Sequence, residues 1–260
     1  MNIKNIKQLA WLEWLEHRRR ILGSIPVLYF FSVPGFLLPL ISQRDIDSEL
    51  IGRYLQQYQL LYSALSQSEL QQIIMIDFRL TVMVLTAALI SPFLGILDSI
   101  GSEKEGRTIE NLLVLPLSDA EIISGKIVTC WLAGILLSWL LWFVYFLFML
   151  LYSTPPAAFH LLSGSWLGLI LLLVPAAGLL MNLLGIIIAV LVQKIQTGYN
   201  LGFLLVFPLA LLLTMLGFGL YRLTFTNVLF VSVLFTLLDG LLFKVAYSTF
   251  NREKIMLRYK

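Results

Sequence analysis

The sequence predicts an all-α, polytopic membrane protein, and three observations support this fold class. Hydrophobic residues make up 59% of the chain and charged residues only 13%, a balance typical of multi-span membrane proteins rather than of soluble domains. Long apolar runs recur along the chain, and a helix of about 20 residues crosses the hydrocarbon layer. The runs lack the alternation of barrel strands, so each is expected to be a helix that satisfies its own backbone hydrogen bonds.

Six runs are long enough to cross a membrane: Ile21–Ile41, Leu80–Ile100, Ile127–Tyr152, Trp166–Val192, Leu201–Tyr221 and Val228–Phe250. Because six is even, both termini are expected on one side. If that side is the inside, the inner segments hold 13 of the 18 Lys and Arg residues, the outer segments hold 3, and 2 lie near span ends. This excess predicts cytoplasmic termini. The expected location is the plasma membrane, the inner membrane of a bacterium. It also explains the net charge of +3 without a nucleic-acid partner.

Residues 1–20, before the first span, are predicted to form an amphipathic helix in the cytoplasmic interface. Its apolar surface comes from Ile3, Ile6, Ala10, Trp11, Trp14 and Leu15, and the basic cluster Arg18–Arg20 follows. Tryptophan favours headgroup depth and clustered arginine is attracted to anionic lipid. Membrane lipid is therefore an expected partner of this segment.

Residues 42–79, between the first two spans, are predicted to be a largely helical outer loop. Leu50, Tyr54, Tyr58, Leu61 and Leu65 recur at the spacing of one helical face. Two interpretations stay open: the loop packs on the ends of the spans, or it forms a lid or a dock for an outer partner. The other connections are short and no linker or repeat is visible, so residues 1–260 are predicted to be one domain.

Prolines and small residues mark the interior of the spans. Pro92 and Pro175 each lack a backbone donor and are expected to kink their helices. Gly178 and Gly185, in the fourth predicted span, leave room for a neighbouring helix to approach closely.

Residues 101–126 form a polar stretch between the second and third spans and are expected to face the cytoplasm. Ser102 and Glu105 stand at the S-x-x-E spacing of a capping box, and so do Ser118 and Glu121. The first box predicts a short helix that ends at Pro116, and the second predicts a helix that continues directly into the third span. A simple connection between two spans would need neither this length nor two caps.

Within that stretch, SEKEGRTIENLLVLPLSDAEIISGK closely resembles the signature E-x-E-x-G-T-x-E-x-L-L-x-x-P-x-S…E-I-x-x-G-K of type-2 ABC exporter permeases, the ABC-2 family. The matching positions are Glu103, Glu105, Thr108, Glu110, Leu112, Leu113, Pro116, Ser118, Glu121, Ile122, Gly125 and Lys126. One departure is that Gly106 precedes Arg107, where the family has its glycine directly before the threonine. The amphipathic N-terminal segment, the six spans and the closing FNREKIMLRYK are also similar to the family.

The resemblance implies a function and a set of partners. In the ABC-2 family this stretch forms the coupling helix, which sits in a groove of a separate ATP-hydrolysing subunit. The implied ATPase-coupling residues are Glu103, Glu105, Gly106, Arg107, Thr108, Glu110, Leu112, Leu113 and Pro116. The chain would then be the permease of an ATP-driven exporter, paired with a second copy or a related permease. Two ABC ATPase subunits would bind the ATP and magnesium.

The chain itself is expected to be no enzyme and to bind no cofactor or metal. It lacks a G-x-x-x-x-G-K-[ST] phosphate loop, since GSEKEGR carries Arg107 in place of the lysine. Cys130 is interpreted as a small buried apolar residue, and His160, alone in a predicted outer loop, is assigned no role. The apolar spans, rich in Phe, Leu and Trp, favour an amphiphilic substrate such as a lipid, a drug or a peptide.

Four polar residues within the predicted spans are intramembrane candidates: Asp98, Asn182, Asp239 and Lys244. Asp98 is expected at the interface, and Lys244 is expected to extend to the cytoplasmic surface. Asp239 is expected either to bond a polar group on another span, for instance Asn182, or to line the transport path. The alternative function is an ATP-independent transporter, which would depend on such charges, or an assembly factor.

Overall fold

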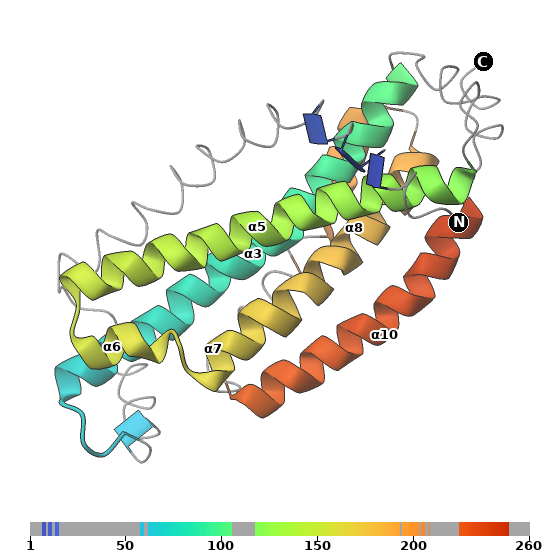
Figure 1. Ribbon diagram of the computed structural model, residues 1–260. Coiled ribbons are helices and arrows are strands. Elements are labelled where there is room, and N and C mark those ends of the chain that lie inside the picture. Colours follow the sequence, from blue (N-terminus) through green and yellow to red (C-terminus); the bar gives the residue numbers. More distant parts are fainter. Residues whose placement is uncertain are drawn as a thin grey trace.

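The computed structural model describes residues 7–8, 10–11, 14–15, 58–59, 62–105, 118–192, 194–202, 204–205, 208 and 224–249 (Figure 1). These residues form helices and connecting turns, and no strand occurs among them, which confirms the all-α class. The first predicted span, most of the fifth and residues 106–117 lie outside this part of the chain. The six described residues of the N-terminal segment are helical.

The described helices are α3 (Gln67–Glu105), α5 (Asp119–Tyr152), α6 (Pro155–His160), α7 (Gly164–Gly168), the π-helix η1 (Leu169–Leu173), α8 (Val174–Leu191) and α10 (Phe225–Thr249). Four stretches are long and apolar enough to cross a membrane: Leu80–Lys104, Asp119–Tyr152, Pro155–Leu191 and Phe225–Thr249. They correspond to the second, third, fourth and sixth predicted spans, so those four predictions are confirmed by length and composition.

The helices α3 and α8 form the centre of the bundle, with α5 against both and α10 against α8 (Figure 1). At one end of the bundle, Ser153 beyond α5 bonds Gln72 near the start of α3; at the other, Lys126 of α5 bonds Ser99 of α3. Therefore α5 runs antiparallel to α3. We call the end that holds Glu103, Lys104 and Lys126 the segment end, because residues 106–117 connect there, and the opposite end the far end.

The helices α5 and α10 leave much of their apolar surface exposed. In an 18-residue apolar segment of α10 only 22% is buried, whereas 67% is buried in the corresponding segment of the span that contains α8. The large apolar side chains exposed on α5 and α10 are leucine, phenylalanine, valine, tryptophan and tyrosine. A bilayer accommodates such a surface because lipid tails are as apolar as leucine.

The helix α3 begins thirteen residues before the predicted start of its span at Leu80. The reason is a capping box that the sequence analysis did not recognise: the Glu69 carboxylate accepts from the Ser66 backbone N–H at 2.8 Å, and Ser66 Oγ accepts from the Glu69 N–H at 3.4 Å. The hydrogen bonds from Ser66, the backbone bond first, lower the pKa of Glu69. Residues 67–79 of the predicted outer loop are thus a helical extension of the second span.

The two capping boxes predicted in residues 101–126 have opposite outcomes. The box at Ser118 is confirmed, since Glu121 N donates to Ser118 Oγ at 3.3 Å and Ser118 N donates to Glu121 Oε2 at 3.0 Å. From it α5 continues into the third span, as predicted. The prediction that a helix begins at Ser102 is wrong, because α3 continues through Ser102 and ends at Glu105. Ser102 Oγ instead donates to the Ser99 carbonyl at 3.4 Å.

The fourth span contains a π-helix that ends two residues before Pro175. In a π-helix a carbonyl accepts from the residue five positions later, and for Ile170 that residue is Pro175, which has no N–H. Trp139 Nε1 of α5 donates to the Ile170 carbonyl at 3.0 Å and so supplies the missing donor. Trp131 Nε1 donates to the Pro175 carbonyl at 2.8 Å. Two tryptophans of α5 therefore stabilise the irregular turn of its neighbour.

Glycines allow α3 to approach both of its neighbours. A Cβ at Gly134 of α5 would lie 2.3 Å from Pro92 Cγ, and a Cβ at Gly185 of α8 would lie 2.4 Å from Ile96 Cγ2. Gly178 also faces α3, with a hypothetical Cβ 3.3 Å from the Ala88 carbonyl oxygen. The predicted close packing at Gly178 and Gly185 is confirmed, and Gly134 provides the same contact for α5.

Gly134→Ala is expected to destabilise the protein, whereas Gly240→Ala is expected to leave it as stable or stabilise it. The added methyl at position 134 meets the rigid Pro92 ring, an overpacking that costs about 1–3 kcal/mol. At Gly240 of α10 nothing lies within 4 Å, so alanine contributes only its helix propensity of up to about 1 kcal/mol. Thermal unfolding in detergent measures both, and equal midpoints for the two variants would contradict the close contact at Pro92.

Candidate functional site

At the segment end, a buried lysine joins the two helices that flank residues 106–117. The Lys126 side chain of α5 is 1% exposed, and its Nζ donates to Glu103 Oε1 at 2.8 Å and to Ser99 Oγ at 2.7 Å. A buried ammonium is tolerated only when it is paired and hydrogen-bonded. The ends of α3 and α5 are therefore held at a fixed separation.

A second lysine joins α3 to the end of α8. Lys104 is buried, and its Nζ donates to the carbonyls of Ala189, Val190 and Val192, the last two at 3.2 Å. The last carbonyls of a helix have no partner within the helix, and a cation is favoured there. Lys104 thus caps α8 with a side chain of α3. Together, Lys104 and Lys126 connect three spans at the segment end.

The coupling residues implied by the sequence fall partly within this structure. Glu103 lies in α3 and is paired with Lys126, and Glu105 is the last residue of α3. Gly106, Arg107, Thr108, Glu110, Leu112, Leu113 and Pro116 lie outside the described residues. The structure therefore describes the two helices to which this segment is attached, and its role in coupling remains a prediction.

The four intramembrane candidates have different surroundings. Asp98 is half-buried and accepts a hydrogen bond from the Tyr199 hydroxyl. Asn182 is buried, and its Nδ2 donates to the Ile127 carbonyl at 3.1 Å, which links α8 to α5. Lys244 is exposed on α10. No hydrogen bond joins Asn182 to Asp239, so that suggested pairing is wrong, since the Asn182 amide is directed at α5 instead.

Asp239 is the most unusual of the four. It is only 4% exposed, and its Oδ1 has no hydrogen-bond partner within the described part of the chain. It lines a cavity of about 410 Å³ between α10, α8, η1 and α5. An uncompensated buried carboxyl group is costly in a protein interior, and its presence marks this cavity as a candidate binding site.

At the far end, a buried cluster centres on Asp77 of α3. The Tyr58 hydroxyl donates to Asp77 Oδ2 at 2.7 Å, and Asp77 Oδ1 lies 2.8 Å from both Trp166 Nε1 and His160 Nε2. All four side chains are buried. Because Tyr58 belongs to the predicted outer loop, Trp166 to α7 and His160 to α6, one carboxyl group holds four segments together. The assignment of no role to His160 is therefore wrong.

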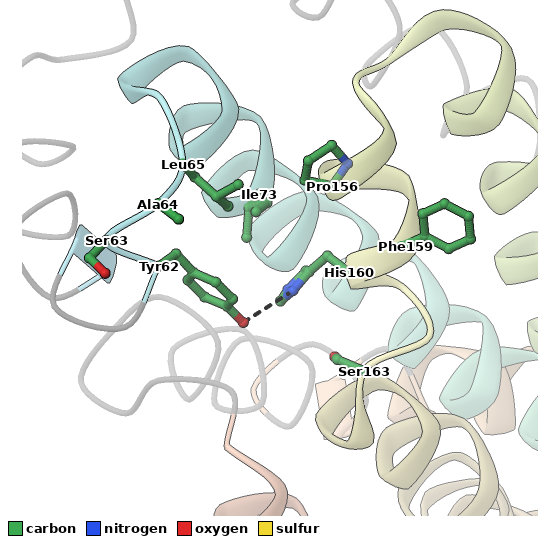
Figure 2. A pocket seen from close by; sticks show the side chains of 9 residues that line it. All are labelled: Tyr62, Ser63, Ala64, Leu65, Ile73, Pro156, Phe159, His160 and Ser163. Carbon is green, nitrogen blue, oxygen red and sulfur yellow. Dashed lines mark hydrogen bonds between the residues drawn. The ribbon is translucent and has the colours of Figure 1, made fainter.

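The hydrogen bonds indicate which nitrogen of His160 carries the proton. Its Nε2 faces a carboxylate oxygen, so Nε2 is the donor. Its Nδ1 lies 3.5 Å from the Tyr62 hydroxyl, at the outer limit of a hydrogen bond (Figure 2).

Figure 2 shows a cavity of about 440 Å³ beside this cluster. His160 and Tyr62 point toward each other across it, while Leu65, Ile73 and Pro156 form apolar walls. Of the polar side chains that face it, Tyr62 and His160 contact each other, and His160 also bonds Asp77. Of the two interpretations of the outer loop, packing on the ends of the spans agrees with the contacts of Tyr58 and Tyr62.

Sequence reasoning missed this cluster because its members are far apart in the chain. Tyr58, Asp77 and His160 span about a hundred residues, and each is unremarkable alone. The available signal was Asp77 itself, a carboxylate in the apolar stretch IIMIDF, which implies a buried partner. Among the described residues no group of three His, Cys, Asp or Glu could hold a metal ion. Cys130 is buried, as predicted.

Comparison with known proteins identifies a family for this chain. The model of a protein family described as ABC-2 family transporter protein matches residues 34–250. The match covers most of the chain, including residues 101–126, both lysine contacts at the segment end and the Asp239 cavity. No curated protein and no solved structure matches the chain.

Asp77→Asn is expected to destabilise the protein by about 1–3 kcal/mol, because the amide places a donor among the donors of Tyr58, His160 and Trp166. Hydrogen exchange around Tyr58 and Tyr62 should become faster in the variant. Glu69→Gln, on the same helix, is the matched control, since glutamine also serves in a capping box. If both variants unfold at the temperature of the parent, the cluster does not stabilise the far end.

Proposed function

The chain belongs to the ABC-2 family of transporter proteins, and from this membership we propose that it is the permease subunit of an ATP-driven exporter. Within an exporter of this kind the permease forms the translocation path and separate ATPase subunits supply the energy. The observation that carries the proposal is that residues 106–117 join α3 to α5, and that the contacts of Lys126 and Lys104 tie these two helices to each other and to α8.

These contacts support the coupling role because they let a displacement pass into the bundle. At one side of the segment α3 is continuous to Glu105, and at the other α5 begins at Asp119 behind a capping box. Lys126 keeps the two helices together, and Lys104 extends the connection to α8. A push on the segment therefore moves three spans together instead of being absorbed by a loose linker.

The ATPase partner would contact residues of the segment itself. Leu112 and Leu113 would bury apolar surface in its groove, while Glu105 and Glu110 would form charge-assisted bonds with basic groups. Gly106, Arg107, Thr108 and Pro116 would shape the turn on either side. Glu103 has a different part in this proposal, since its carboxylate pairs with Lys126 and holds the flanks of the segment.

The partner subunits would bind ATP and magnesium, and this chain would bind neither. ATP-driven closure of the two ATPases would push the segments and change the interface between two permeases, either two copies of this chain or this chain and a relative. Both termini, the N-terminal helix with its lipid contacts and residues 101–126 would face the cytoplasm, in agreement with the distribution of basic residues.

The substrate would be an amphiphile such as a lipid, a drug or a peptide, moved outward. The apolar surfaces of α5 and α10 support this, because a substrate already dissolved in the membrane can reach the bundle from the side.

An ATP-independent transporter or a membrane assembly factor is the second candidate. The buried carboxyl group of Asp239 favours the transporter, since proton or ion coupling uses intramembrane charges. This one carboxyl group is a weaker basis than the coupling segment.

The proposal predicts that a charge-reversed segment loses its ATPase. Glu110→Arg combined with Leu113→Asp is expected to lower the amount of co-purifying ATPase about tenfold or more, because it removes an apolar contact and reverses a charge. The measurement is a pull-down of the tagged chain in mild detergent, scored for nucleotide hydrolysis.

The control is Glu69→Arg combined with Gln71→Asp, which makes similar charge changes at the far end. This control variant should co-purify with as much ATPase as the parent does. A well-folded parent that brings down no nucleotide-hydrolysing protein would contradict the exporter, and equal loss in both variants would contradict the assignment of the segment.

A further inference from the structure

We propose that the cavity at Asp239 binds the amino group of a monocationic amphiphile, with the apolar tail along α8 and α10. The proposal rests on the exporter function in so far as it names a class of substrate. The binding itself depends only on this chain.

The cavity lies within the membrane-spanning part of the bundle and is of a size that suits a small molecule. Its volume is about 410 Å³, within the range of about 300–1,000 Å³ of ligand pockets. Leu171, Leu179 and Val233 contribute apolar walls. The lining side chains Leu229 and Val233 are also exposed on α10. The cavity therefore opens toward the surface that an amphiphile in the bilayer would meet.

The polar groups of the described lining can accept hydrogen bonds but have no proton left to donate. Ser232 Oγ donates to the Val228 carbonyl at 2.7 Å, and Thr236 Oγ1 donates to the Ser232 carbonyl at 2.8 Å. Trp131 Nε1 donates to the Pro175 carbonyl at 2.8 Å. Each proton is thus used within a helix or between helices, and the oxygen lone pairs of Ser232 and Thr236 remain.

Asp239 adds the strongest acceptor to this set. Its Oδ1 is buried and has no hydrogen-bond partner among the residues that the structure describes, and Asp239 is only 4% exposed. Lys244 does not compensate it, because it lies five residues further along α10, about 140° around the helix, and is exposed. The complementary ligand group must bring donors and positive charge, which an amine does.

An amine satisfies the site whichever partner holds the proton. An ammonium meets a carboxylate, or a neutral amine meets a carboxylic acid, and both pairs contain the same number of protons. An alcohol offers one donor and no charge, and a carboxylic acid would place two acidic groups together. The site is therefore expected to prefer amines over alcohols and fatty acids of the same chain length.

The test uses the full chain in lipid nanodiscs, without an ATPase, and radiolabelled decylamine as the probe. Binding to empty nanodiscs is subtracted, because decylamine also partitions into lipid. We expect saturable binding that unlabelled decylamine displaces at a concentration at least about tenfold lower than decanol. Asp239→Asn, which is nearly isosteric, should weaken decylamine binding about tenfold or more and remove the preference over decanol.

Three further variants test whether a loss of binding comes from the missing carboxylate or from a change in folding. Asp239→Glu should keep the preference for the amine, since it restores the carboxylate. Ala176→Phe, which fills the cavity wall on α8, should weaken decylamine binding while Asp239 is intact. Glu69→Gln, an exposed carboxylate at the far end, should bind as the parent does. Thermal unfolding of each variant confirms that it is folded.

Equal affinity of parent and Asp239→Asn for decylamine, or equal displacement by decanol and decylamine in the parent, would overturn the proposal. Because no ATPase is present, this failure is distinct from failure of the exporter function. If no ATPase co-purifies but decylamine binds as expected, the binding site is supported and the exporter function is contradicted.

Discussion

The close approach of α3 to α5 and α8 is the constraint on which the rest of the structure depends. Inside a bilayer the hydrophobic effect does not draw helices together, since lipid tails solvate them equally well. Dispersion contacts must do so, and they require small residues where backbones meet. Gly134 against Pro92 and Gly185 against Ile96 meet this requirement near the middle of α3. The positions of both ends of the bundle follow from these contacts.

Polar side chains join the bundle at its two ends, and they differ from Asp239 in one physical respect. Lys104, Lys126 and Asp77 are buried and surrounded by complementary groups. In a medium of low dielectric such bonds are strong, and a missing partner is correspondingly costly. Asp239 lies in the same medium, and within the described part of the chain its Oδ1 has no partner. The charged groups Lys104, Lys126 and Asp77 at the ends of the bundle are thus paired, whereas the cavity contains an unused acceptor.

This distribution suits a permease that is driven from one end. The lysine contacts make the segment end rigid, so that force applied to residues 106–117 reaches α3, α5 and α8. The helix α10, in contrast, is the least buried of the described spans and contacts α8 on one side. The site at Asp239 lies where the rigid part and α10 meet. A change in their spacing would alter the cavity directly, so the proposed coupling segment would act on the proposed binding site.

The sequence by itself determined the helical class, the four confirmed spans, the buried Cys130, the cap at Ser118 and the family signature. Each is a local property: a run of apolar residues, a single residue in such a run, or a motif of a few neighbours. A local motif can also predict wrongly. The S-x-x-E spacing occurs at Ser66 and at Ser102, but it caps a helix only at Ser66. Whether Ser102 begins a helix depends on whether α3 has already ended, which the motif does not contain.

Only the tertiary structure decided which polar groups meet. His160 lies 83 residues from Asp77 and Asn182 lies 55 from Ile127, and no spacing rule relates such positions. The same holds for Asp239, since the described donors that line its cavity are directed at backbone carbonyls instead. Hydrophobic periodicity sets what a segment becomes, because it acts on neighbours along the chain. Hydrogen-bond partners are set by packing angles and distances between helices, which exist only once the helices have assembled.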